Sequence, residues 1–158
     1  MEFGGTFMNR YMSRKNNKGN RRITTDAFEI ATAILFQNPV QNFALAPNNL
    51  DDAPAVCMDF MRQVPTTWDE TRFIEGYPGK YVVLARRHHD KWYIAGVNAT
   101  DSPVSIDLNM AAKGDRITLY SDGTDGAPVR SDIVVGKKAT RITMLQNGGF
   151  VAVMDAKQ

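Results

Sequence analysis

The spacing of apolar residues changes once along the chain, near residue 64. Between residues 26 and 63, apolar positions recur at the helical spacing of three and four, in two runs separated by Pro39 and by a turn at residues 47–49. From Tyr81 onward, apolar and polar residues alternate with a period of two, which is typical of strands that bury one face. The sequence therefore predicts a helical segment followed by a β-rich segment.

The helical segment contains one helix that is apolar on every side. Residues 27–37, AFEIATAILFQ, predict this helix, with Thr24, Thr25 and Asp26 as N-cap candidates. A helix that is apolar all round needs cover on several faces. We expect a chain of 158 residues to lack the surface for this, so that a second copy of the chain covers the exposed faces.

A short strand and a second helix are predicted next, at residues 40–45 and 53–63. Pro65 closes the second helix, because the residue before a proline disfavours the helical conformation. Helix, strand and helix in this order form one unit of an α/β architecture, in which a strand needs parallel neighbours. Since this region supplies none, residues 1–63 are predicted to be part of a larger α/β domain.

The β-rich segment predicts an antiparallel β-sandwich of seven short strands. The first two strands form a hairpin, in which a polar turn joins residues 81–86 to residues 92–97. Turns rich in glycine, aspartate and asparagine separate the other strands. These five strands are predicted at residues 104–108, 116–120, 133–135, 140–144 and 150–154.

Charge is distributed unevenly along the chain. Six basic residues lie between Arg10 and Arg22, and residues 3–25 contain no acid. This segment has no nucleic-acid-binding motif and is interpreted as a solvated loop, with nucleic-acid binding ranked last among the alternatives. The remaining chain has more acids than bases, so no nucleic-acid partner is expected.

Other whole-chain features exclude some classes of protein. Cys57 is the one cysteine, so an intrachain disulfide is excluded, and its place in an apolar helix predicts a small buried residue. No apolar run approaches the roughly 20 residues of a membrane span. The first residues lack the charged and apolar regions of a signal peptide.

Two acids beside a tryptophan are candidates for chemistry. Asp69 and Glu70 follow Trp68, and paired carboxylates can divide acid and base roles when their environments differ. Neighbours in an extended segment point apart, however. We therefore expect Trp68 to pack between domains and the acids to accept hydrogen bonds from nearby donors such as Arg72 or backbone amides.

Other candidate groups also favour structural interpretations. His88 and His89 have no third ligand placed by the sequence and are interpreted as an exposed hairpin tip. Residues 121–126, SDGTDG, lack the later glutamate of an EF-hand and predict a turn. Trp92 and Tyr93 point to opposite faces of a strand, so at most one belongs to the core. The P-loop, GxSxG, CxxC and HExxH patterns are absent.

Three segments together resemble a known family. Residues 37–41 (QNPVQ), 64–71 (VPTTWDET) and 81–98 (YVVLARRHHDKWYIAGVN) resemble the C-terminal end of family 97 glycoside hydrolases, the alpha-glucosidase and alpha-galactosidase relatives of Bacteroides-like bacteria. The resemblance covers most of the chain and is weakest beyond about Asp101. It implies an α+β fold in which residues 1–63 are the helical end of a catalytic (β/α)8 barrel and residues 64–158 are an all-β antiparallel sandwich.

The resemblance also implies a function. The parent enzyme would cleave α-glycosidic bonds in oligosaccharides with two carboxylates. Its catalytic carboxylates and calcium ligands would come from earlier segments, so no catalytic or metal residue is assigned here, and the chain alone is expected to be inactive while it buttresses the barrel. A periplasmic or secreted location is implied.

Barrel active sites lie at the carboxyl ends of the strands, and the loops that would reach this face contain Glu2, Asn48 and Asn49. These three residues are predicted to line the substrate cleft. The alternative is a free-standing carbohydrate-binding or interaction β-sandwich module that uses Trp92 or Tyr93. The choices of glucoside or galactoside, and of retention or inversion, stay open.

Overall fold

The structure is a computed structural model that describes residues 8–11, 19–45 and 53–156. Within these residues two helices precede eight strands, and the positions of both helices confirm the sequence prediction. In chain order the elements are α1 (Asp26–Leu35), α2 (Ala55–Met61), β1 (Glu70–Tyr77), β2 (Tyr81–His88), β3 (Lys91–Asn98), β4 (Val104–Leu108), β5 (Arg116–Asp122), β6 (Pro128–Val134), β7 (Thr140–Met144) and β8 (Gly149–Asp155).

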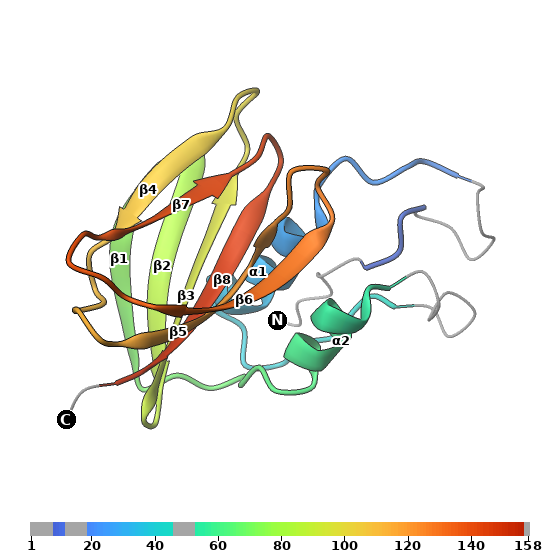
Figure 1. Cartoon of the computed structure of the whole chain (residues 1–158). Coiled ribbons are helices and arrows are strands. Elements are labelled where there is room, and N and C mark those ends of the chain that lie inside the picture. Colours follow the sequence, from blue (N-terminus) through green and yellow to red (C-terminus); the bar gives the residue numbers. More distant parts are fainter. Residues whose placement is uncertain (1–7, 12–18, 46–52, 157–158) are drawn as a thin grey trace.

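The strands form two antiparallel sheets. Six strands make the large sheet in the order β1-β2-β3-β8-β5-β6, and β4 pairs with β7 in the small one. The small sheet lies over one face of the large sheet, and α1 lies behind the opposite face (Figure 1). β1 and β6 form the two edges of the large sheet, while the central strands are covered on both sides. The predicted antiparallel sandwich is confirmed.

Alternate residues of the central strands fill the core between the two sheets. Trp92 and Ile94 of β3 point to this side, where they join Phe150 of β8 and Met144 of β7. Gly96 gives the Phe150 ring its room, because a Cβ at position 96 would lie 2.5 Å from a ring carbon. The expectation that only one of the neighbouring Trp92 and Tyr93 belongs to this core is correct.

The other set of alternating residues packs against α1. Ala95 and Val151 face Ile30 and Ile34, all fully buried. The helix begins at Thr25, whose Oγ1 accepts a hydrogen bond from the Phe28 N–H at 3.1 Å. Most of α1 is therefore buried by its own chain, and the expectation that it needs a second copy for cover is wrong.

Two sequence predictions need correction. Residues 40–45 do not form a strand, since they run irregularly after α1, with the Gln41 side chain hydrogen-bonded to the Ala33 carbonyl oxygen. β1 was not predicted at all, because as an edge strand it exposes most of its residues and lacks an apolar alternation. The predicted boundary at residue 63 stays a prediction, as does the barrel origin of the helices.

Candidate functional site

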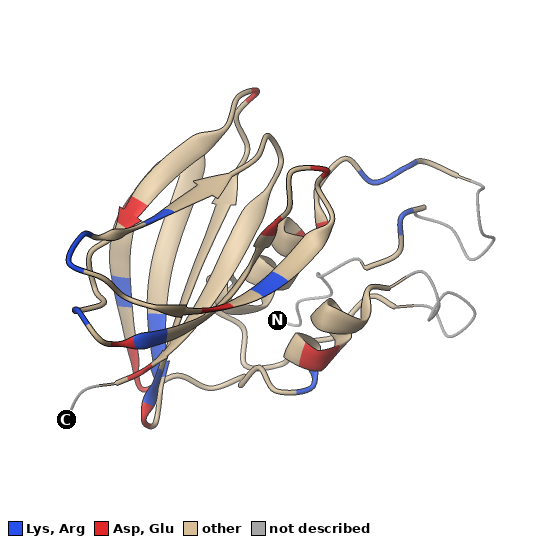
Figure 2. Cartoon of the chain, in the orientation of Figure 1, with Lys and Arg blue, Asp and Glu red and all other residues tan. Residues whose placement is uncertain are grey.

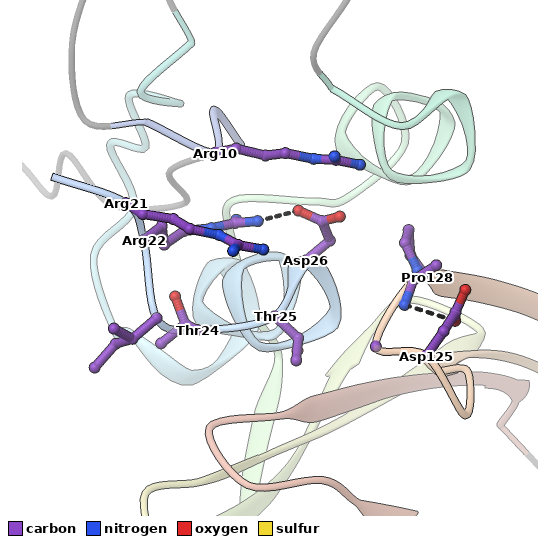
Figure 3. A pocket seen from close by; sticks show the side chains of 11 residues that line it. Arg10, Arg21, Arg22, Thr24, Thr25, Asp26, Asp125 and Pro128 are labelled. Carbon is purple, nitrogen blue, oxygen red and sulfur yellow. Dashed lines mark hydrogen bonds and ion pairs between the residues drawn. The ribbon is translucent and has the colours of Figure 1, made fainter. Parts of the chain in front are cut away.

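A polar pocket lies where the basic segment meets the first turn of α1 and the β5–β6 turn (Figure 3). Its volume is about 580 Å³, and its walls include Arg10, Arg21, Arg22, Asp26 and Asp125. Arg22 forms an ion pair with Asp26. The Oδ1 of Asp125 accepts a hydrogen bond from the Ala127 N–H. Of the hydroxyl groups in the described walls, that of Thr24 donates to Glu29 and that of Thr25 accepts from the Phe28 N–H, so both are engaged at the start of α1.

Asp122 is a partly buried carboxylate close to this pocket, at the end of β5. Its Oδ2 accepts a hydrogen bond from the Gly149 N–H at 3.0 Å, while its Oδ1 is buried without a hydrogen-bond partner in the described residues. Burial raises the pKa of Asp122, and nearby Asp26 acts in the same direction, against the hydrogen bonds it accepts.

This raised pKa predicts a pH-dependent effect of Asp122→Asn. Because the folded pKa lies above the unfolded one, the contribution of Asp122 to stability falls as the pH rises through the window between them. We expect the variant to gain stability relative to the wild type as the pH rises above about 4, the ordinary pKa of an aspartate, measured as the difference in urea-unfolding free energy.

Asp125→Asn is the matched control for Asp122→Asn, because it makes the same charge change in the exposed turn that follows β5. A constant difference for Asp122→Asn over the whole pH range would show that the Asp122 carboxyl titrates alike in the folded and unfolded chain.

Arg86 joins α1 to the sheet. Its side chain comes from β2 on the helix side and is 7% exposed. Nη1 donates hydrogen bonds to the carbonyl oxygens of Ile34, at 3.0 Å, and Phe36, at 3.2 Å, which end α1. Nε donates to Thr71 Oγ1 at 3.2 Å, and the guanidinium lies 4.8 Å from the centre of the Trp68 ring. We call Arg86 with these partners the Arg86 clasp.

The acids beside Trp68 are engaged in structure, as predicted. Asp69 Oδ2 accepts a hydrogen bond from the His89 N–H at 2.7 Å. Glu70 accepts one from Arg72 Nε at 2.6 Å, and this bond holds the pKa of Glu70 below its ordinary value. Each acid therefore satisfies a nearby donor, and the pair is not arranged for acid–base catalysis.

The aromatic and histidine side chains of this region pack on one another. The Trp68 ring lies edge-on to Tyr93, with 5.4 Å between ring centres. His88 Nδ1 lies 2.8 Å from the Thr67 carbonyl oxygen, and His89 occupies the tight turn with a φ of 54°. In residues 8–11, 19–45 and 53–156, no three side chains of the metal-binding types are gathered for an ion. No helix of these ranges could cross a bilayer.

Three further candidates can be placed. Burial raises the pKa of the Cys57 thiol to about 12, so the thiol stays protonated and is a core residue, as predicted. Trp92 is buried beneath the Arg72 guanidinium, 4.6 Å from its ring centre, and Tyr93 is half-buried. Trp92 is therefore not an open stacking surface, and the carbohydrate-binding alternative stays a prediction. Glu2, Asn48 and Asn49 lie outside the described residues, and their role stays a prediction.

Asn98 is a structural residue whose role the sequence interpretation missed. It is completely buried at the end of β3. Its Nδ2 donates to the carbonyl oxygens of Ser102 and Leu145, and its Oδ1 accepts from the N–H and the hydroxyl of Thr100. A polar residue at an inward position of an alternating strand, as at Arg86 and Asn98, was the available signal.

Comparison with known proteins gives a family for this architecture. The family described as "Glycosyl-hydrolase 97 C-terminal, oligomerisation" matches residues 67–155. A probable retaining alpha-galactosidase of Streptomyces bingchenggensis is 31% identical over 130 residues, which are 82% of this chain and 20% of that protein. A retaining alpha-galactosidase of Bacteroides thetaiotaomicron is 33% identical over 101 residues, 61% of this chain and 15% of that protein.

Solved structures agree with this match. A beta-arabinopyranosidase shares 53% identity and a TM-score of 0.90, over 97% of this chain and 25% of that one. A family 97 enzyme of Pseudoalteromonas sp. strain K8 has the same fold, with a TM-score of 0.68 and 22% identity over 88% of this chain and 24% of that one.

The sandwich and its match to residues 67–155 define a C-terminal domain of a glycoside hydrolase. The chain belongs to glycoside hydrolase family 97, and the resemblance seen in the sequence is confirmed. It spans about a fifth or less of the length of the two curated relatives.

Proposed function

We propose that this chain is the C-terminal part of a family 97 glycoside hydrolase and that it buttresses the catalytic barrel. The observation that carries the proposal is the 53% identity to the beta-arabinopyranosidase over nearly the whole chain, helices included. The Arg86 clasp supports a structural role, because it fixes α1 to the sandwich through buried hydrogen bonds. In this proposal α1 and α2 are the end of the barrel wall.

The proposal includes a substrate class for the parent enzyme. The two curated relatives are named as retaining alpha-galactosidases, and the most similar of the structures described above is named as a beta-arabinopyranosidase. In the L series, a β-arabinopyranoside has the ring configuration of an α-D-galactoside without the exocyclic hydroxymethyl group. The parent enzyme is therefore proposed to retain configuration and to act on pyranosides with the galactose arrangement of hydroxyls.

The chemistry of this proposal lies elsewhere in the enzyme. The catalytic carboxylates and the calcium ligands would come from segments outside this chain, and the enzyme would act in the periplasm or outside the cell. The domain would also take part in assembly between copies of the enzyme, as its family description indicates.

The isolated chain tests the buttressing proposal. We expect the purified 158-residue protein to release no nitrophenol from aryl α-galactoside, β-L-arabinopyranoside or α-glucoside. The Asp26→Asn and Asp125→Asn variants, which alter the carboxylates of the polar pocket, serve to trace any activity found. Turnover by the wild type that either variant abolishes would overturn the proposal, because the chain would then hold its own catalytic group.

A further inference from the structure

The polar pocket has more arginines than acids in its described walls. Arg10, Arg21 and Arg22 line the hollow of about 580 Å³ together with Asp26 and Asp125. Since these walls have three positive and two negative side chains, their balance is one positive charge. A concave site with walls of one prevailing charge attracts ligands of the opposite charge, so the pocket favours an anion.

A short antiparallel pairing brings the arginines together. The Arg22 N–H donates to the Arg10 carbonyl oxygen at 2.8 Å, and Tyr11 and Arg21 form a bridge next to it. The Arg10 and Arg21 side chains extend in the same direction, and Asp125 lies beyond them on the β5–β6 turn (Figure 3). Figure 2 shows these basic segments beside the acidic β5–β6 turn, which lines the same pocket. The ends of the pocket therefore differ in charge.

Arg21 is the arginine best placed to bind a ligand. Its side chain is exposed and makes no hydrogen bond or ion pair with the described residues. Arg22, in contrast, is engaged by Asp26. A guanidinium binds a carboxylate through two parallel hydrogen bonds, which fix both the position and the orientation of the ligand. A carboxylate of the ligand would therefore lie at the Arg21 end.

The Asp125 end of the pocket calls for hydroxyl groups on the same ligand. Asp125 is exposed, and among the described residues only its Oδ1 accepts a hydrogen bond, from the Ala127 N–H. An ionised carboxylate accepts hydrogen bonds and donates none, so it repels a second anion and binds hydroxyl groups. Ile23 and Pro128 add apolar surface to the walls, and the volume is that of a small-molecule site. The ligand therefore combines a carboxylate with hydroxyl groups on a carbon skeleton.

We propose that the polar pocket binds an acidic sugar, with the guanidinium groups of Arg10 and Arg21 on its carboxylate and Asp125 on its hydroxyl groups. The choice of a sugar among hydroxylated carboxylates rests on the proposed role of the parent enzyme in cleaving glycans. Binding of this kind needs no catalytic group, so the pocket would hold an acidic residue of a glycan and leave its bonds intact.

Titration followed by NMR tests this binding on the 158-residue protein. The probes are D-galacturonate, D-galactose and acetate at equal ionic strength. Galactose has the same ring hydroxyls without the acid, and acetate has the acid without the ring. We expect saturable shifts of the amide signals of the pocket with galacturonate, and binding at least about tenfold weaker with galactose and with acetate.

Arg21→Gln removes the charge that would bind the carboxylate. We expect this variant to bind galacturonate at least about tenfold more weakly, because a hydrogen bond between charged groups is lost. Arg116→Gln is the matched control, since Arg116 is also exposed but begins β5, at the end away from the pocket, and this variant should bind as the wild type does. Both side chains are exposed, so both variants should fold, which thermal unfolding checks.

Four outcomes would overturn the inference. Without any shift on addition of galacturonate, the pocket is no site for an acidic sugar. Equal binding of galactose would show that the arginines do not select an acid, and equal binding of acetate would show that the sugar ring is not recognised. Equal effects of the two substitutions would remove Arg21 from the site. The proposed function fails separately, through turnover of aryl glycosides by the isolated chain, so the two failures are distinguishable.

Discussion

Replacing Arg86 by alanine is expected to lower the free energy of unfolding by about 3 kcal/mol. The substitution leaves the carbonyl oxygens of Ile34 and Phe36 without the donor that now ends α1. It also removes the guanidinium that lies over the Trp68 ring. Burial lowers the pKa of Arg86, but an arginine keeps its charge at neutral pH, so the lost bonds are charge-assisted. Urea unfolding followed by circular dichroism measures the loss.

Arg87→Ala is the matched control, because Arg87 is the next residue of β2 and points to the other side. Its side chain is 32% exposed and lies 3.4 Å from Asp69 Oδ2. A partly solvated ion pair of this kind contributes about 1 kcal/mol or less. If the two alanine variants lose the same stability, the Arg86 clasp is not what holds the helix to the sheet.

Asn98→Ala is expected to lower the free energy of unfolding by a similar amount, about 3 kcal/mol. The fully buried amide binds two backbone carbonyl oxygens from different loops, those of Ser102 and Leu145, at 2.8 and 2.9 Å. The same amide accepts two hydrogen bonds from Thr100. Alanine would remove the side-chain partner of each of these buried groups.

Thermal unfolding and hydrogen exchange together measure this second effect. Exchange should accelerate in the two loops that Asn98 joins, around residues 99–102 and 145–148, before the sheet itself opens. Thr100→Val serves as the control, because it removes one hydroxyl and leaves the hydrogen bonds of Asn98 to the two carbonyl oxygens in place. This variant should lose about 1 kcal/mol of unfolding free energy. An Asn98→Ala variant as stable as this control would contradict the role given to the amide.

Alternation in the sequence was sufficient to predict most of the strands. It worked best for β4 and β7, whose observed bounds equal the predicted ones, since each has one buried and one solvated face. It failed for β1, which exposes residues of both faces. The prediction of a strand at residues 40–45 also failed, because beyond a single bridge residue at Gln41 the segment has no strand pairing among the described residues.

The packing of α1 against the large sheet could have been predicted from the sequences of β3 and β8. WYIAGV in β3 and FVAV in β8 are continuous apolar runs, which indicate strands buried on both faces. Such runs call for a further layer behind the sheet, and the apolar helix in the same chain supplies it. The sequence interpretation treated helix and sandwich as separate domains and so missed this pairing.

The structural candidates could be predicted only in part. The hydrogen-bonding roles of Asp69 and Glu70 were predicted correctly. Neighbouring residues of an extended segment point apart, so the two acids could not act together as a catalytic pair. The Arg86 clasp was not predicted, because its partners at the end of α1 are about 50 residues away in sequence and come close only through tertiary packing. The inward position of a polar residue signals that Arg86 is buried with partners, but not which groups those partners are.

The central claim is that this chain supports catalysis carried out by other segments of a family 97 hydrolase. The most direct test replaces the matched quarter of the beta-arabinopyranosidase by this chain and measures kcat/KM for an aryl β-L-arabinopyranoside. We expect the chimera to keep kcat/KM within about tenfold of the parent, and the same chimera with Arg86→Ala to unfold at a lower temperature. A chimera that folds and binds substrate yet has no activity would contradict the claim, because the replaced segment would then contribute to the chemistry itself.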